Sequence, residues 1–387
     1  MTVKSSIYLD NAATSFPKPP SVYDAIDAYN RNLGVAVGRS GYSHALDLHR
    51  TVDRCRKQAA ELLGAEEPDR IAFTFNCTDS LNLAIHGLLN SNDHVIVSSV
   101  EHNSVLRPLR SLQDWSNVDV TLVPPGETGR VEPAAFRKAI QANTRLIALT
   151  HASNVTGTLQ PIADVGQIAR EAGVPFLVDA AQTAGHTPID LTTLPIDLLA
   201  CAGHKGLLGP LGTGLLYLRP GMEEHVTSLR QGGTGSRSED YHQPDQLPDK
   251  YESGNHNAPG LVGLQAALDW IGQQSVETIE AQSRELTAQL IDGLRGIDAI
   301  HLHGSGGNDG RVNVVSITVD GFDPQDLAAV LDDSFGIQTR AGLHCAPGAH
   351  KALGTFGLGG TVRISTGPFT TPDDVEQCVT ALADITG

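Results

Sequence analysis

Short apolar runs that alternate with amphipathic segments are the feature that most constrains the fold of this 387-residue chain. Within each run hydrophobic residues follow one another, so both faces of the segment are apolar. Such runs, separated by helical periodicity, are typical of parallel strands that helices cover on both faces. The pattern predicts a mainly parallel sheet with strands at residues 70–75, 94–99, 118–123, 145–151, 174–179, 196–202 and 213–218, and helices at 78–90, 103–114, 132–141 and 161–172.

The alternation stops at residues 232–257, which are rich in Gly, Ser, Asp, Gln and Pro and predict a long functional loop. Helices at 259–273 and 275–295, a strand at 312–320, and helices near 324–334 and 372–385 then describe a smaller α+β unit. Single hydrophobic cores stop growing at roughly 250–300 residues, so two domains are expected. We predict an N-terminal segment (1–20) that packs with the small domain, a large domain (21–256) and a small C-terminal domain (257–387).

Composition and charge argue against several classes of protein. The chain has 27 Lys and Arg against 44 Asp and Glu, a net charge of −17 that disfavours binding to nucleic acid or anionic membranes. It has no apolar targeting segment at its start and no run near the roughly 18 apolar residues of a spanning helix, so a cytoplasmic protein is expected. Five scattered cysteines without a CxxC pair predict neither disulfides nor a zinc site. His301 and His303 have no third ligand nearby, so no metal is expected.

Polar side chains follow several of the predicted strands, at the edge where open α/β sheets bind ligands. Each of them has an ordinary alternative role as a helix cap or turn residue, but their convergence on one sheet edge favours a binding site. The residues are Asn76, Cys77, Thr78, Asp79 and Ser80 after the first strand, Glu101, His102 and Asn103 after the second, then His151 with Asn154, and Asp179 with Gln182.

Lys205 is the most informative single residue, because it lies between an apolar strand and the glycine-rich residues 206–214. A lysine next to glycines in a strand-end loop can point inward, lose its proton in a desolvated site and condense with an aldehyde as a Schiff base. Asp179 is available to keep a pyridine nitrogen protonated. The pair matches the Lys and Asp of a pyridoxal 5'-phosphate (PLP) site. A nucleotide-binding P-loop is excluded, since Lys205 precedes the glycines instead of following the last of them.

Segments along nearly the whole chain resemble, in their usual order, the class V aminotransferases, and within them the cysteine desulfurases and selenocysteine lyases. These are PLP enzymes of fold type I, so the resemblance implies a large PLP-binding domain and a homodimer in which the 232–257 loop reaches the partner's site. The segments are YLDNAATSFPKP (8–19), EHNS (101–104), SNVTGTLQPI (153–162), VDAAQTAGH (178–186), GHKGLLGPLGTG (203–214) and VRISTGPFTT (362–371).

The resemblance also implies a role for each matching residue. Lys205 would hold the cofactor and move the Cα proton of the substrate, and Asp179 would pair with the ring nitrogen. Arg363 would bind the substrate carboxylate as a bidentate fork. Ala202 replaces the hydroxyl residue that many relatives place against the phosphate. His102 would stack on the ring, Gln182 would bind the ring hydroxyl, and Asn255 stands where a threonine of the neighbouring subunit often contacts the phosphate. The implied cofactor-binding residues are Cys77, Thr78, His102, Asp179, Gln182, His204, Lys205 and Asn255. The implied substrate-binding residues are Asn154, Arg340 and Arg363.

The segment RAGLHCAP (340–347) decides which reaction the resemblance implies. It is similar to the RxGxHC segment that carries the nucleophilic thiol in cysteine desulfurases with a short active-site loop. A buried cysteine is ordinarily a small hydrophobe, but Arg340, His344 and Pro347 describe a polar, stiff loop in which a cation favours thiolate. Catalytic residues would therefore be Lys205, His102 and Cys345, and the enzyme would convert L-cysteine to L-alanine with a persulfide on Cys345.

Alternatives remain open within and outside this family. A selenocysteine lyase acting on L-selenocysteine would use the same residues, and a class V aminotransferase or epimerase would use Lys205 without Cys345. A non-catalytic sulfur-trafficking protein would keep the fold without turnover, although the retained site residues argue against it. A desulfurase would also need an acceptor for its sulfur, with iron–sulfur cluster assembly among the pathways that it could serve.

Overall fold

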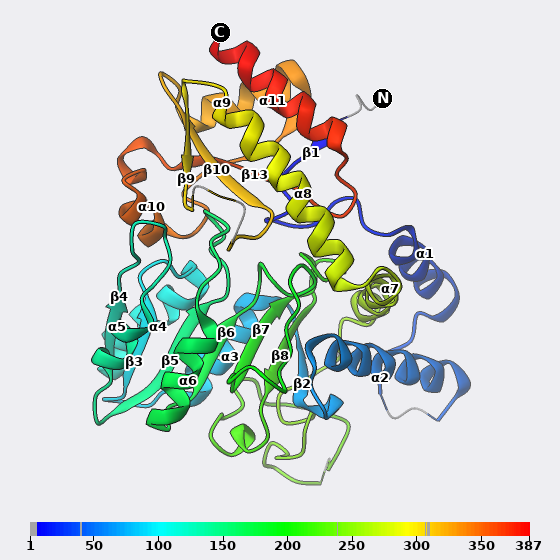
Figure 1. Ribbon diagram of the computed structural model, residues 1–387. Coiled ribbons are helices and arrows are strands. Elements are labelled where there is room, and N and C mark those ends of the chain that lie inside the picture. Colours follow the sequence, from blue (N-terminus) through cyan, green and yellow to red (C-terminus); the bar gives the residue numbers. More distant parts are fainter. Residues whose placement is uncertain (1–5, 39–40, 238, 306, 308–309) are drawn as a thin grey trace.

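The computed structural model describes residues 6–38, 41–237, 239–305, 307 and 310–387. Figure 1 shows a large sheet with helices on both faces, and a smaller antiparallel sheet with its own helices beyond one end of it. The α/β class and the mainly parallel large sheet predicted from the sequence are confirmed. No helix among the described residues is both long enough and apolar enough to cross a bilayer.

The large sheet has seven strands, and its neighbouring strands run parallel except where β8 pairs with β7 and β2. The apolar runs of the sequence become these strands, most of which are buried along their whole length. In spatial order the strands are β2 (Ile71–Thr74), β8 (Gly214–Leu218), β7 (Leu198–Ala202), β6 (Phe176–Asp179), β5 (Thr144–Thr150), β3 (His94–Ser98) and β4 (Asp119–Val123).

Helices cover both faces of this sheet because successive strand residues point to opposite sides. Ile96 and Ile147 belong to one hydrophobic cluster, whereas Val95, Val97 and Ala148 belong to another. The first cluster packs against α1 (Pro20–Ala28), α2 (Ser43–Leu63), α5 (Pro133–Ala139), α6 (Ile162–Ala172) and α7 (Ala258–Gln274), and the second against α3 (Cys77–Leu88) and α4 (Asn103–Ser116).

Helix α7 lies with the large domain, whereas the sequence places residues 257–387 in the small domain. It packs against α1 and α2, and its Leu261, Leu264 and Ile271 join the first hydrophobic cluster. The helix is apolar over most of its surface, so its sequence pattern does not reveal which domain it covers. Helix α8 (Val276–Arg295) is the first to contact the small sheet. The predicted domain boundaries themselves stay a prediction.

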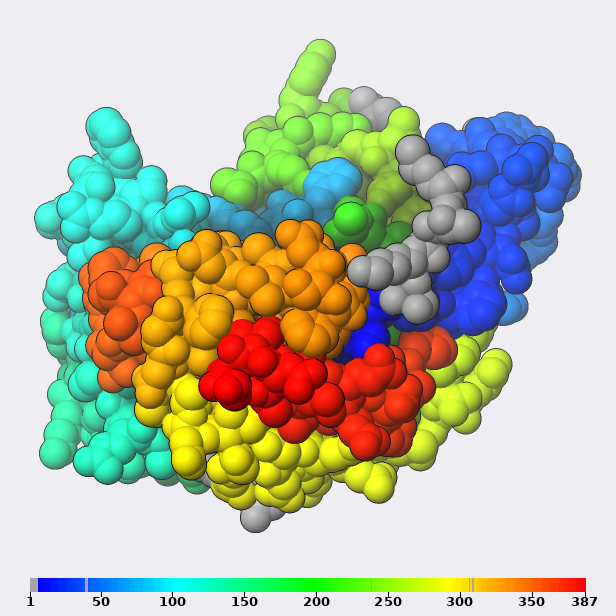
Figure 2. Space-filling model, turned by 90° about the horizontal axis from the view of Figure 1, so that it is seen from above, coloured from blue at the N-terminus to red at the C-terminus, as the bar shows by residue number. Residues whose placement is uncertain are grey.

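The small sheet is antiparallel, with the strand order β12 (Arg340–Gly342), β13 (Thr361–Ser365), β10 (Val314–Val319) and β9 (Ile300–His303). Helices α8, α9 (Pro324–Phe335) and α11 (Pro372–Thr386) form a separate core with it. Figure 2 shows α11 (red) lying along the segment that contains α8 (yellow), and the two helices are in contact. Helix α10 (Pro347–Leu353) was not predicted, and neither were helices α1 and α2 or strands β9 and β13.

The N-terminal strap, residues 7–18, connects the two parts of the molecule. Its first strand, β1 (Ile7–Tyr8), pairs in parallel with β11 (Ile337–Gln338) beside the small domain. Further along the strap, Ser15 N donates to the carbonyl of His204, which lies in the loop after β7. The remaining short elements are a π-helical turn at Tyr29–Leu33 and 3₁₀ turns at Pro68–Arg70, Met222–Glu224 and Phe356–Leu358; the described residues of the 232–257 loop form no helix or strand.

Candidate active site

A cavity of about 190 Å³ lies at the carboxyl edge of the large sheet, where that sheet meets the small domain. The structure brings most of the residues singled out from the sequence together around it. The predicted residues that line the cavity are Cys77, Thr78, His102, Asn154, Asp179, Gln182, His204, Lys205, Arg340 and Arg363. Cys345 and Asn255, which received roles from the family resemblance, do not line it, and of the residues singled out by strand-end position Asp79, Ser80, Glu101, Asn103 and His151 do not line it either.

Lys205 and Asp179 enter the cavity at the ends of neighbouring parallel strands, with Lys205 in the loop after β7 and Asp179 at the end of β6. Asp179 is the last residue of β6, and its Oδ1 accepts hydrogen bonds from Ala181 N at 2.9 Å and from Cys77 Sγ at 3.4 Å. Burial lowers the pKa of Lys205 below the ordinary 10.5, although the carboxylate of Asp179 acts in the opposite direction. The amine is therefore easier to deprotonate than a surface lysine.

The backbone next to Lys205 is held by the N-terminal strap. The carbonyl of His204 accepts hydrogen bonds from Thr14 Oγ1 at 3.0 Å, Ser15 N at 3.0 Å and Lys18 Nζ at 3.2 Å. Burial lowers the pKa of Lys18 to about 8. Gly206 must lack a side chain, because a methyl group there would collide with the carbonyl oxygen of Ala184. Lys205 thus projects from a loop with little freedom to move.

One end of the cavity offers hydrogen-bond donors suited to an anion. Helix α3 begins there, capped by Asn76, whose Oδ1 accepts from Asp79 N at 2.9 Å. Other N–H groups of a first helical turn have no partner within the helix, and the helix dipole favours a negative charge beside them. Thr78 Oγ1 lies 2.7 Å from Ser104 Oγ, and the buried Nδ1 of His204 has no partner among the described residues. Ala202 also lines this cavity and offers no hydroxyl.

The His102 ring is fixed as the N-cap of α4. Its Nδ1 accepts a hydrogen bond from Ser104 N at 3.0 Å and lies 2.8 Å from Ser104 Oγ. Burial lowers the pKa of His102 to about 4, with the charge of Asp179 opposing that shift. At neutral pH the ring is therefore uncharged. Gln182, which lines the same cavity, donates from Nε2 to the carbonyl of Ala12 in the strap at 3.1 Å.

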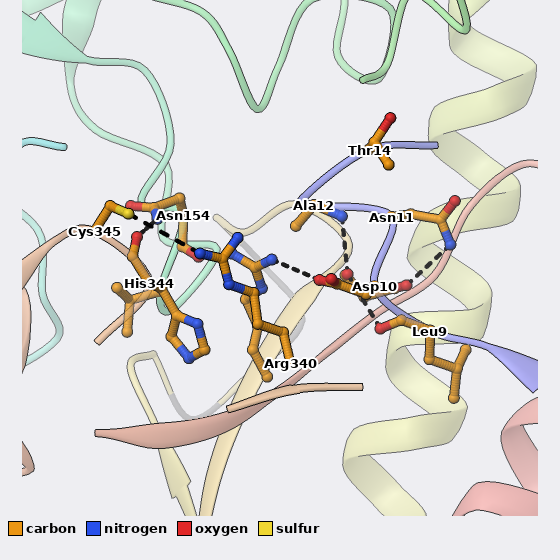
Figure 3. Close-up of polar contacts among 12 residues, drawn as sticks. Leu9, Asp10, Asn11, Ala12, Thr14, Asn154, Arg340, His344 and Cys345 are labelled. Carbon is orange, nitrogen blue, oxygen red and sulfur yellow. Dashed lines mark hydrogen bonds and ion pairs between the residues drawn. The ribbon is translucent and has the colours of Figure 1, made fainter. Parts of the chain in front are cut away.

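Arg363 and Asn154 join the large domain, the small domain and the strap. Arg363, on β13, is only 1% exposed; its Nη2 lies 2.7 Å from Asp10 Oδ1, and its Nη1 donates to Asn154 O at 3.0 Å. Asn154 Nδ2 in turn donates to the carbonyl of His344 at 2.5 Å. Burial lowers the pKa of Arg363, and Asp10 opposes that effect. Figure 3 shows Asp10 on one side of this cluster and Asn154, His344 and Cys345 on the other.

Cys345 is exposed, whereas the other four cysteines are buried. It follows β12 in a tight turn in which His344 (φ +48°) and Cys345 (φ +58°) both adopt the left-handed conformation that side chains disfavour. Hydrogen bonds hold the turn: Asn103 N donates to Cys345 O at 2.7 Å. Arg340 Nη2 lies 4.0 Å from Cys345 Sγ, and Arg340 also lines the cavity (Figure 3). The thiol is thus accessible to solvent and close to the cavity lining.

Three other residues from the sequence analysis lie elsewhere. Asn255 lines a separate depression of about 30 Å³ that also includes Phe75 and Arg230, so it does not reach this cavity within its own chain. His301 and His303 are occupied by Asp320 and Thr318, at 2.8 Å and 2.9 Å respectively. No group of three metal-ligating side chains occurs among the residues that the structure describes.

Sequence reasoning did not single out Asp10 or Ser104 and noted Glu101 only for its position after a strand; the structure places all three in contact with residues that line the cavity. Ser104 contacts both Thr78 and His102, and Thr150 N donates to Glu101 Oε1 at 3.0 Å. All three lie in segments that carried the family resemblance or followed a strand, but nothing in their local sequence indicated their partners.

The cavity fits PLP, which the sequence predicts as the cofactor. PLP has an aldehyde, a pyridine nitrogen and a phosphate, and the cavity offers a partner for each. Lys205 supplies an amine of lowered pKa, and Asp179 a carboxylate. The unpartnered Nδ1 of His204 and the first turn of α3 supply donors for a phosphate. Thr78 and Gln182 would bind the remaining polar groups of PLP.

Known proteins resemble this chain over nearly its whole length. The family described as aminotransferase class V matches residues 7–378. A probable cysteine desulfurase of Methanothermobacter thermautotrophicus is 34% identical, over 100% of this chain and 96% of that protein. The cysteine desulfurase IscS of Methanosarcina thermophila is 33% identical, over 99% of this chain and 93% of its own length.

Solved structures give the same result. The apo structure of a cysteine desulfurase from Thermococcus onnurineus superposes with a TM-score of 0.92 and 31% identity, covering 98% of this chain and 94% of that one. The Escherichia coli cysteine desulfurase CsdA gives a TM-score of 0.87 and 29% identity, over 98% of this chain and 94% of its own. The fold is therefore that of the fold type I PLP enzymes, and the chain belongs to the class V aminotransferase family.

Proposed function

We propose that this chain is a PLP-dependent cysteine desulfurase that converts L-cysteine to L-alanine and leaves a persulfide on Cys345. One observation carries the proposal: the exposed thiol of Cys345 lies 4.0 Å from Arg340, a residue that lines the same cavity as Lys205. Arg340 therefore places a positive charge beside an accessible sulfur nucleophile. Relatives named cysteine desulfurase, which match this chain over nearly its full length, support the assignment.

Lys205 and Asp179 would act at the cofactor end of the site. PLP, when bound, draws electrons from Cα of an amino acid and thereby weakens the bond between Cβ and sulfur. Asp179 would hold the proton on the pyridine nitrogen, and the hydrogen bonds from Ala181 and Cys77 keep its carboxylate in place. Lys205, whose pKa burial lowers, would take up and return the proton at Cα as an amine.

Arg363, Arg340 and Asn154 would orient the substrate, and Cys345 would accept its sulfur. The guanidinium groups would bind the carboxylate and so fix the direction in which the sulfur points. The thiolate of Cys345 would then form an S–S bond with that sulfur as the Cβ–S bond breaks. The electron pair of the broken bond remains on the three-carbon fragment, which becomes alanine after protonation.

A homodimer and a sulfur acceptor complete the proposal. Asn255 borders a depression together with Phe75, which is 47% exposed, and Leu211 nearby is 67% exposed. A second copy covering these apolar side chains would also bring Asn255 toward the partner's cofactor. Exposure of Cys345 leaves its persulfide open to an acceptor protein. Iron–sulfur cluster assembly and a cytoplasmic location, both expected from the sequence, stay predictions.

Replacing Cys345 with serine tests the proposed reaction. The PLP-loaded variant should keep the visible absorbance of wild type but release no sulfide from L-cysteine in the presence of a reductant, because the sulfur has no acceptor on the enzyme. Cys378→Ala, which removes a buried thiol of the same domain, is the matched control and should release sulfide as wild type does. Wild-type sulfide release by Cys345→Ser would contradict the proposal, and unchanged keto-acid formation would favour an aminotransferase.

A further inference from the structure

The guanidinium of Arg363 is already engaged before any substrate arrives. Its side chain is buried, Nη2 lies 2.7 Å from Asp10 Oδ1, and Nη1 donates to Asn154 O at 3.0 Å. Its Nε has no acceptor among the residues that the structure describes. A carboxylate that binds to Arg363 therefore shares this guanidinium with the carboxylate of Asp10.

Asp10 is held in this position by backbone contacts on both of its sides. Leu9 N donates to Gln338 O at 2.9 Å, and Ala12 N donates to Ser365 Oγ at 2.9 Å. Figure 3 shows the labelled strap residues Leu9, Asp10, Asn11 and Ala12 gathered on one side of the cluster. Because its backbone is fixed, the Asp10 carboxylate remains beside Arg363 when the site fills.

The charges at this end of the cavity add up to one positive charge. Arg340 and Arg363 each contribute one, and Asp10 removes one; Arg340 has no carboxylate within 4 Å among the described residues. One substrate carboxylate makes the group neutral, whereas a second negative charge would have no partner in a largely buried site. At the cofactor end, the protonated ring nitrogen of bound PLP would offset the charge of Asp179.

We propose that Asp10 is a specificity-determining residue, which positions Arg363 and restricts the site to amino acids with a single negative charge besides the phosphate of the cofactor. The inference rests on the proposed function, because it takes Arg363 as the carboxylate-binding residue. Asp10 acts through Arg363 and does not itself line the cavity. Its charge therefore acts over several ångströms, a range at which charges in a protein interior change affinity by roughly tenfold.

Asp10→Asn separates the charge of this residue from its geometry. Asparagine has nearly the same shape and keeps an oxygen that can accept from Arg363 Nη2, but it leaves the site with two positive charges. L-Asparagine and L-aspartate are a matched pair of ligands, since they differ in one charge and hardly in shape. Their dissociation constants would be measured by calorimetry on the PLP-loaded protein, which reports binding without turnover.

Wild type should bind L-asparagine more tightly than L-aspartate, and in Asp10→Asn this preference should fall by about tenfold. Asp10→Glu keeps the charge and should keep most of the preference. The control Asp27→Asn removes an exposed carboxylate that pairs with Arg31 on the surface and should change nothing. A preference in Asp10→Asn within twofold of wild type, or an equal loss in Asp10→Glu, would overturn the proposal. Asp10→Ser provides the same charge change if the asparagine variant does not fold.

The same variants separate positioning from charge. If Asp10 positions Arg363, KM for L-cysteine should rise in Asp10→Ser by roughly tenfold or more, with a smaller change in kcat, because the carboxylate is bound before and during the reaction. An unchanged KM in that variant would remove the positioning role. Failure of wild type to release sulfide from L-cysteine would refute the proposed reaction alone, since the calorimetric comparison requires no sulfur chemistry.

Discussion

Glu101 is a buried carboxyl group whose pKa depends on contacts that the local sequence does not reveal. The side chain is 0% exposed, and its Oε1 accepts hydrogen bonds from Thr150 N at 3.0 Å and from Ser98 Oγ. Its Oε2 has no partner among the described residues. Burial raises the pKa of Glu101 to about 8, and the nearby charge of Asp179 acts in the same direction. The carboxyl group beside His102 is thus largely neutral at pH 7.

This pKa predicts a loss of stability as the pH rises. Between about 4.5 and 8 the folded protein keeps a proton on Glu101 that the unfolded chain releases, so the free energy of unfolding falls with pH across that window. Glutamine at position 101 cannot ionise. Between pH 5 and pH 8 the free energy of unfolding should therefore fall less in Glu101→Gln than in wild type, by a margin of at least about 1 kcal/mol. Urea unfolding at both pH values measures the difference. Glu61→Gln, at an exposed site, should follow wild type, and parallel curves for Glu101→Gln and wild type would contradict the prediction.

At the level of elements, one buried ion pair joins helix α2 to the segment that leads into α7. Arg56 Nη1 and Nη2 lie 2.6 Å and 2.8 Å from the two carboxylate oxygens of Glu252, and Phe73 N donates to Glu252 Oε1 at 2.6 Å. Both side chains are almost fully buried. The pair fixes the end of the 232–257 loop, and with it the backbone before Asn255, against the first strand of the large sheet.

Glu252→Gln should destabilise the protein strongly. It leaves the buried guanidinium of Arg56 without a counter-charge, and removing one member of such a pair costs about 3–5 kcal/mol. The midpoint of urea unfolding measures the effect. Lys57 and Glu61 on the same helix form an exposed pair, so Glu61→Gln should cost less than about 1 kcal/mol. Similar midpoints for the two variants would show that Glu252 is not the counter-charge that Arg56 requires.

At the level of the whole molecule, the active site exists only where separate parts of the chain meet. The loops after the strands of the large sheet supply Lys205 and Asp179, the small domain supplies Arg340, Arg363 and the proposed nucleophile Cys345, and the strap touches both parts. Phe75 and Leu211, exposed near Asn255, are the apolar side chains that the proposed dimer would cover.

Leu211→Glu tests the proposed dimer. Analytical ultracentrifugation of wild type should give a mass close to twice the 40.9 kDa of one chain. The mass of the glutamate variant should shift toward that of one chain, because burying a charge in an apolar interface is costly. The variant should also bind PLP more weakly, because it loses the contact of the second copy with the cofactor. Trp115→Glu, on α4 near the opposite edge of the large sheet, changes an even more exposed apolar residue and should remain dimeric. A monomeric wild type, or a Leu211→Glu variant that stays fully dimeric, would contradict the interface.

Sequence alone determined the strands of the large sheet and the residues at their ends, because hydrophobic periodicity is a local property. Strand-end position singled out His102, Asp179 and Lys205, which the structure brings to one cavity. The sequence did not reveal helices α1, α2 and α10, strands β9 and β13, or the packing of α7, whose apolar surface fits either domain.

Tertiary structure alone decided which distant groups touch. Asp10 and Arg363 are 353 positions apart in the chain, and Asn154 reaches His344 across 190 positions. No local pattern encodes such contacts, because they depend on how the strap and two domains pack together. Burial is decided in the same way: the pKa of Glu101, the engaged guanidinium of Arg363 and the exposure of Cys345 all follow from what the folded chain places around each side chain.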